Sequence, residues 1–147
     1  RHLADKTVKD NNKSCVLRIS NGQHSALLTG DLEAVSEKAL LNQHKPSALE
    51  STMLLVPHHG SKTSSSDEFL QAVKPQLAVI QAGWKNQYGH PNTTVLDRYD
   101  ALGIETLNTA QFGALEFKFR HNSTAIERRD AVSERLRYWH LHETGAR

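Results

Sequence analysis

The segment 53–61, Met-Leu-Leu-Val-Pro-His-His-Gly-Ser, changes abruptly from apolar to polar residues. Its first part, Met53 to Val56, has the length and composition of a short strand that is buried on both faces, as in a parallel sheet. Pro57 ends this stretch, and His58 and His59 follow it directly. Because functional residues gather on loops that a rigid sheet holds in place, this junction is the first candidate site.

The same order of apolar stretch and polar loop occurs on either side of this segment. On the N-terminal side, residues 26–29 predict a strand that ends at Gly30-Asp31. On the C-terminal side, Leu77 to Gln81 predicts a strand, and His90 lies in the loop that follows it. Functional groups of layered α/β proteins gather at strand ends, so the three loops are expected to meet at one edge of a sheet.

The remaining elements follow from hydrophobic periodicity and turn signals. We predict strands at 14–20, 26–29, 53–56, 77–81, 104–107 and 114–119, and a turn at Asn21-Gly22. We predict helices at 32–42, 67–73 and 93–102. In the first strand, Cys15, Leu17 and Ile19 alternate as one apolar face, with Cys15 as a small core residue. The alternation of helix and strand predicts a layered α/β domain.

Composition limits the class of protein. Hydrophobic residues make up 37% of the 147 residues, enough for a core, and no apolar run approaches the ~20 residues of a membrane-spanning helix. The single cysteine excludes an internal disulfide framework and a cysteine-rich zinc finger. The net charge of +2 does not by itself indicate nucleic-acid binding.

We predict that residues 1–120 form the folded domain and that residues 121–147 form a charged, helical C-terminal tail. The first residues include neither a starting methionine nor a signal-peptide pattern. The chain is therefore expected to begin inside a larger protein.

Asp31, His58, His59 and His90 have the residue types of a hydrolytic metal site. One carboxylate and several imidazoles are the ligands that zinc and similar divalent ions prefer. An aspartate can bridge two such ions, and a pair of metal ions can hold both a hydroxide and a phosphoryl oxygen.

Each residue also has a structural alternative. Taken alone, Asp31 is more readily explained as the N-cap of the following helix. His58 and His59 could form a turn whose imidazoles bond nearby backbone, and His90 could be an ordinary loop residue. Residues 64–66, all serine, are typical of a loop or a cap. The other histidines lie in polar surroundings and are expected to be solvated: His2, His24, His44, His121, His140 and His142.

Together the three loops resemble the ComEC family of competence proteins. The resemblance rests on Leu27-Leu28-Thr29-Gly30-Asp31, on residues 56–66 (Val-Pro-His-His-Gly-Ser-Lys-Thr-Ser-Ser-Ser), on Val73-Lys74-Pro75, on Asn86-Gln87-Tyr88-Gly89-His90-Pro91, and on Asn108-Thr109 with Phe112-Gly113-Ala114. It covers the chain from Asn11 to about Phe119. The combination is specific, although a single motif such as Thr-Gly-Asp is not.

The resemblance implies that the chain is the C-terminal portion of a metallo-β-lactamase-like domain, an αβ/βα four-layer sandwich. The parent would be a multi-pass protein of the bacterial inner membrane that takes up DNA during transformation, working with its own channel portion and other competence proteins. The domain would be soluble, on the extracytoplasmic side, and a nuclease with two divalent ions, zinc or manganese. Asp31, His90 and His58 would bind metal, and His58 and His59 would be the catalytic groups.

The chain also departs from that pattern. The His-x-His-x-Asp-His motif of the wider superfamily is absent, as is the next ligand histidine, so we expect only the C-terminal half of the fold here. The alternatives are a non-catalytic domain that binds DNA or braces the channel, and a small-molecule metallohydrolase. A group of arginines near the C-terminus mildly favours an anionic polymer as the partner: Arg128, Arg129, Arg135 and Arg137.

Overall fold

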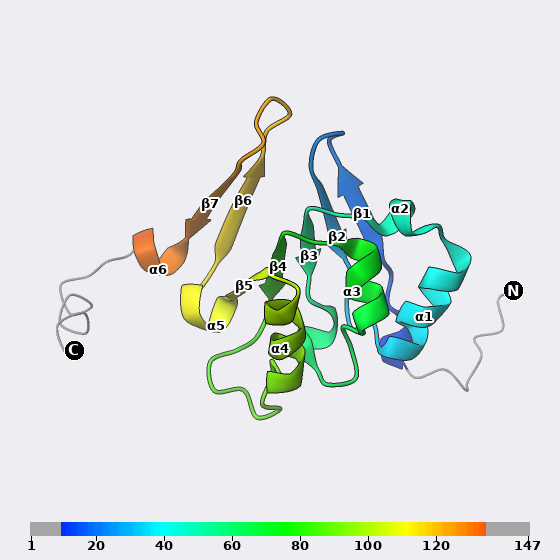
Figure 1. Ribbon diagram of the computed structural model, residues 1–147. Coiled ribbons are helices and arrows are strands. Elements are labelled where there is room, and N and C mark those ends of the chain that lie inside the picture. Colours follow the sequence, from blue (N-terminus) through cyan, green and yellow to red (C-terminus); the bar gives the residue numbers. More distant parts are fainter. Residues whose placement is uncertain (1–9, 135–147) are drawn as a thin grey trace, which may run out of the picture.

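The computed structural model describes residues 10–134 and contains a five-stranded mixed sheet (Figure 1). The strands are β1 (Leu17–Ser20), β2 (Ser25–Leu28), β3 (Met53–Leu55), β4 (Leu77–Ile80) and β5 (Glu105–Asn108), in the order β1-β2-β3-β4-β5. β1 pairs antiparallel with β2, and the other neighbours pair in parallel. The predicted α/β class is thus confirmed.

Helices cover one face of this sheet. They are α1 (Ala34–Gln43), α2 (Pro46–Leu49), α3 (Asp67–Val73) and α4 (Thr93–Ala101), with short 3₁₀ segments η1 (Asp10–Lys13) and η2 (Pro57–Gly60). The parallel strands β2, β3, β4 and β5 lie side by side in the same order as in the sequence. Right-handed crossovers therefore place the connecting helices on one side of the sheet. The core on this side joins residues of β2, β3 and β4 with fully buried Phe69, Val95 and Tyr99.

A separate hairpin covers part of the opposite face. It consists of β6 (Leu115–Phe119) and β7 (Ile126–Asp130), flanked by the short helices α5 (Thr109–Phe112) and α6 (Ala131–Glu134). Phe117 and Phe119 pack against a second core that includes Met53, Val79 and Leu107. The described part of the chain therefore has three layers, which are helices, sheet and hairpin (Figure 1).

The prediction for the first strand needs correction. It begins at Leu17, Cys15 is exposed, and the side chains of Leu17 and Ile19 are each 54% exposed. β1 lies at the edge of the sheet, and the hairpin shields the neighbouring strands more fully. Alternating apolar residues indicate that their side chains lie on the same face of a strand. The alternation does not indicate whether another element of the fold covers that face.

The helical tail that we expected over residues 121–147 is also wrong over Ile126–Asp130, which is a strand. Ile126 pairs with Phe119 and Arg128 with Phe117, and Arg128 forms an ion pair with Glu105 at 2.9 Å. Tertiary pairing has overridden the local preference of a charged segment. Arg135 and Arg137 lie outside the described residues, and the division at residue 120 remains a prediction.

His24 is buried rather than solvated. It is only 5% exposed, its Nε2 lies 2.6 Å from the carbonyl oxygen of Ser123, and its ring centroid lies 5.9 Å from that of Phe119. These partners come from the hairpin, about a hundred residues away in sequence. His44 and His121 are exposed as expected. The other three histidines that we expected to be solvated lie outside the described residues: His2, His140 and His142.

Among residues 10–134, no helix combines the length and apolar character needed to cross a membrane.

Candidate functional site

The loops after β2, β3 and β4 meet at the carboxyl edge of the parallel strands, as the sequence predicts. Backbone hydrogen bonds tie them together. His58 N–H donates to the carbonyl of Gly30 at 3.0 Å, and Asn92 N–H donates to the carbonyl of Gly60 at 2.9 Å. The three loops therefore form one connected surface.

The segment Pro57–Gly60 is a left-handed turn, despite its helix-like hydrogen bonding. His58 has φ 49° and ψ 41°, and His59 has φ 56° and ψ 18°. Gly60 follows with φ 81°. Residues other than glycine rarely adopt this conformation, because Cβ crowds the backbone at a cost of roughly 1–2 kcal/mol per residue. The turn approaches Pro91 closely, since a Cβ atom added at Gly60 would lie 2.7 Å from that of Pro91.

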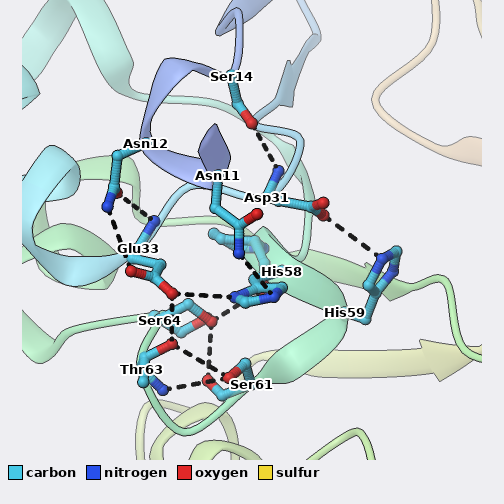
Figure 2. A network of polar contacts seen from close by, with 12 residues as sticks. Asn11, Asn12, Ser14, Asp31, Glu33, His58, His59, Ser61, Thr63 and Ser64 are labelled. Carbon is cyan, nitrogen blue, oxygen red and sulfur yellow. Dashed lines mark hydrogen bonds and ion pairs between the residues drawn. The ribbon is translucent and has the colours of Figure 1, made fainter. Parts of the chain in front are cut away.

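His59 faces Asp31. Its Nε2 lies 3.4 Å from Asp31 Oδ1 (Figure 2). Its Nδ1 lies 2.7 Å from the carbonyl oxygen of Gln81. A carbonyl only accepts hydrogen bonds, so Nδ1 carries the proton, and in the neutral ring Nε2 presents its lone pair toward the carboxylate. Two electron-pair donors placed in this way attract a cation or a proton between them. Both side chains are nearly half exposed, so a solute can reach this point.

His58 is held differently, between Asn11 and Glu33 (Figure 2). Asn11 Nδ2 lies 3.2 Å from His58 Nε2, and Glu33 Oε1 lies 3.8 Å from His58 Nδ1. Nδ1 is buried and makes no hydrogen bond in the described structure. Asn12 also contacts Glu33, because its Nδ2 donates to Glu33 Oε2 at 3.2 Å. The 3₁₀ segment η1 thus covers the inner histidine.

His90 completes the group. Its ring centroid lies 5.9 Å from that of His58, and 6.0 Å from that of Tyr88, whose ring it stacks against at 22°. Partial burial lowers the pKa of His90, and the neighbouring His58 and His59 lower it further. A neutral His90 is therefore favoured when the other imidazoles carry charge.

The serines that follow the turn are anchored by a buried glutamate. Ser64 Oγ donates to the carbonyl of Pro57 at 2.8 Å, which ties the serine loop to the turn. The backbone N–H groups of Ser65 and Ser66 donate to the two oxygens of Glu37 at 2.6 and 2.9 Å, and Ser66 Oγ donates at 2.6 Å. Glu37 is fully buried, and this burial raises its pKa against the opposing hydrogen bonds.

Helix α4 holds the same loop from the other side. Arg98 Nη1 donates to the carbonyls of Ser64 and Ser65 at 3.2 and 3.0 Å. The hydroxyl of Tyr99 lies 3.1 Å from Ser65 Oγ, and burial raises the pKa of this phenol. The loop is therefore clamped between α1 and α4.

The described residues do not complete a metal site. Asp31 Oδ1 and His59 Nε2 lie 3.4 Å apart, and metal-ligating histidines typically have a hydrogen bond like the one from His59 Nδ1 to a carbonyl. A catalytic zinc takes at least three protein ligands. Within residues 10–134, no group of three or more His, Cys, Asp or Glu side chains is arranged to hold a metal ion.

All four predicted residues are thus brought together, although their roles remain predictions. The helix-cap alternative for Asp31 is wrong, because Glu33 occupies the N-cap position of α1. The expected backbone contact of the paired histidines does occur, at His59. Sequence reasoning missed Asn11, Glu33 and Glu37. The polar Asn11-Asn12 was visible in the sequence, but only the fold places it against His58.

Comparison with known proteins found no matching family model. The competence protein ComA of Neisseria gonorrhoeae is 42% identical over 123 residues, which cover 84% of this chain and 18% of that protein. The ComE operon protein 3 of Bacillus subtilis is 39% identical over 76% of the chain and 14% of its own length. The recombination protein 2 of Haemophilus influenzae is 35% identical over 82% of the chain and 15% of its own length. The chain thus spans less than a fifth of these relatives.

Proposed function

This chain is related to the ComEC-type competence proteins, and from that relationship we propose that it forms part of the DNA-hydrolysing domain of a DNA-uptake protein. The names of the relatives support a role in competence. The parent would be a multi-pass protein of the bacterial inner membrane, and this domain would act on its extracytoplasmic side. Its partners would be DNA, the parent's own channel portion and other competence proteins.

The convergence of Asp31, His58, His59 and His90 supports hydrolysis most directly. Four ionisable side chains from three separate loops lie near one another at the carboxyl edge of the sheet: His59 lies 3.4 Å from Asp31, and the ring centroid of His58 lies 6.4 Å from that of His59 and 5.9 Å from that of His90. A purely structural edge does not require strained backbone at two consecutive histidines. Strain of this kind persists where a function needs the resulting side-chain positions.

Within this proposal, the residues divide the chemistry of phosphodiester cleavage. His59 is oriented by the carbonyl of Gln81, and together with Asp31 it would bind a metal ion on the exposed side of the cluster. His58 lies deeper, with Nε2 at Asn11 and the buried Nδ1 facing Glu33, and it would position the phosphate or protonate the leaving oxygen once Nε2 is released from Asn11. His90 borders both imidazoles.

Two divalent ions, zinc or manganese, remain the proposed cofactors of the intact domain. Such ions would supply a hydroxide nucleophile and stabilise charge on the phosphate. Asp31 and His59, whose side-chain atoms lie 3.4 Å apart, are the two residues of this chain that we propose as metal ligands first. Nε2 of His58 contacts Asn11 instead. The metallo-β-lactamase-like sandwich is likewise proposed, and the partly covered sheet face beside the hairpin is compatible with a second sheet.

The test is Asp31→Ala in the intact parent protein. We expect DNA hydrolysis to fall by about 100-fold or more, together with metal content, because a methyl group cannot donate to a cation. Asp97→Ala is the matched control, since Asp97 is exposed on α4. A thermal melt shows whether both variants remain folded. Full metal occupancy and normal cleavage in the Asp31 variant would remove Asp31 from the proposed site.

A non-catalytic domain that binds DNA or braces the channel is the alternative. It is favoured by the lack of a three-donor group within residues 10–134. It predicts that the intact parent binds DNA without cleaving it, and that Asp31→Ala changes uptake but no hydrolysis rate.

A further inference from the structure

A pocket of about 230 Å³ opens beside the candidate site. His59 and His90 form the side that it shares with the site, and the rest is lined mainly by Ala82, Gly83, Asn86 and Tyr88. A molecule that places a phosphate at the two imidazoles would therefore extend into this pocket. Its walls combine small side chains with the flat ring of Tyr88.

The loop that forms the pocket is internally braced. Asn86 Nδ2 donates to the carbonyl of His90 at 2.6 Å and to that of Gly83 at 3.2 Å, while Asn86 Oδ1 accepts from His90 N–H at 2.9 Å. A single side chain thus bridges both ends of the loop. The Tyr88 ring is further held by stacking on His90 at 22°.

Two large aromatic rings on this loop are nevertheless exposed to solvent. Trp84 and Tyr88 are each 73% exposed. Lys85 lies between them in sequence, and its Nζ is 5.9 Å from the centre of the Trp84 ring. Exposed apolar surface beside a concave site is characteristic of binding surfaces. Its chemistry here is that of two π-faces accompanied by one positive charge.

We propose that this loop is a nucleobase-binding subsite, in which a base of a single DNA strand enters the pocket and stacks on Tyr88 while Trp84 and Lys85 contact the adjoining nucleotide. The proposal rests on the proposed function, because it takes DNA as the substrate of the neighbouring site. It adds that the domain recognises unpaired bases. Aromatic side chains bind bases of any sequence through their π-faces, whereas a base inside a duplex offers no free face.

The geometry favours a nucleotide over an apolar protein segment. The pocket is lined on one side by His59 and His90 of the candidate site, where the proposed function places a phosphate, and Lys85 adds a positive charge beside the Trp84 ring. A single DNA strand offers bases that can stack on Tyr88 and Trp84 and phosphates that can contact Lys85, whereas an apolar protein segment offers no partner for this charge.

The experiment measures binding by the whole 147-residue chain, without any hydrolysis step. The probes are a short oligothymidylate and an abasic oligonucleotide of equal length and charge. Fluorescence of Trp84 is followed in a Trp139→Phe background, because a stacked base quenches indole emission. We expect quenching and tighter binding with the oligothymidylate. Equal binding of both probes without quenching, or no binding of either, would overturn the proposal.

Variants of Tyr88 separate the ring from its hydroxyl. Tyr88→Leu should weaken oligothymidylate binding by about 5- to 100-fold, which corresponds to the loss of one base–aromatic stack. Tyr88→Phe retains the ring and should bind as the unaltered chain does. Circular dichroism checks the fold of both. If Tyr88→Leu binds as tightly as Tyr88→Phe, the subsite is wrong. Because no cleavage is measured, this failure is distinct from failure of the Asp31 experiment in the parent.

Discussion

The carboxylate of Glu37 on α1 accepts a hydrogen bond of 2.6 Å from the backbone N–H of Ser65, which lies 28 residues further along the chain. Through Ser64 and its bond to the carbonyl of Pro57, this contact reaches the turn that carries His58. A residue outside the candidate cluster is therefore connected to the turn that carries His58. We regard Glu37 as a positioning residue.

Glu37→Ala should lower the free energy of unfolding by about 2–4 kcal/mol, because the N–H groups of Ser65 and Ser66 lose their buried acceptor. Urea unfolding of the chain measures this change. Glu68→Ala provides the control, since Glu68 is exposed on α3, and it should change stability by less than about 0.5 kcal/mol. Equal stability of the two variants would show that water replaces the carboxylate without cost.

The pH dependence of stability should also report Glu37. Burial raises its pKa above the ordinary 4.5, so the folded chain binds this proton more tightly than the unfolded chain does. Stability from this group is therefore fully present below pH 4.5 and is lost as the pH rises through the raised pKa. Glu37→Gln cannot titrate at this position. The stability of the unaltered chain minus that of Glu37→Gln should fall with rising pH across this window, and a difference that grows with pH would contradict the assignment.

Gly60→Ala tests the contact between the histidine turn and the loop after β4. Gly60 has φ 81°, and an added Cβ would lie 2.7 Å from Pro91 Cβ. Gly103→Ala is a matched control, because Gly103 has φ 67° and open space around the added atom. The control should lose about 1–2 kcal/mol from the left-handed backbone alone. Gly60→Ala should lose about 1–3 kcal/mol more, measured by urea unfolding, from the steric overlap. Equal losses would mean that the two loops move apart freely.

The chain alone should hydrolyse DNA weakly or not at all. Its described residues provide no group of three metal donors, and a weakly held ion is readily lost. Cleavage of labelled DNA by residues 1–147, with added zinc or manganese, measures this. Robust cleavage that requires metal would show that two oriented donors suffice.

The sequence predicted the parallel strands and the meeting of Asp31 with the histidines, because both follow from local signals. A buried apolar run predicts a central strand, and parallel strands end at one edge. The structure corrected residues whose surroundings depend on distant parts of the chain. His24 is buried only because the β6–β7 hairpin folds over it, and Leu17 is exposed because β1 is an edge strand.

The supporting residues of the site were hidden for the same reason. Glu33 and Glu37 resemble ordinary charged residues on an amphipathic helix, and nothing local distinguishes them from exposed Lys38. Their burial arises where the serine loop returns to α1. Long-range contacts of this kind leave no periodic trace in the sequence.

The left-handed turn at His58 and His59 sets a trade-off for anyone who engineers this domain. Glycine at either position would release backbone strain, and selection for heat resistance alone would reward that replacement. The same replacement would delete an imidazole from the cluster. Library selections that rank variants by melting temperature alone would therefore tend to remove the histidines of the candidate site, and positions 58 and 59 should be kept unchanged in such selections.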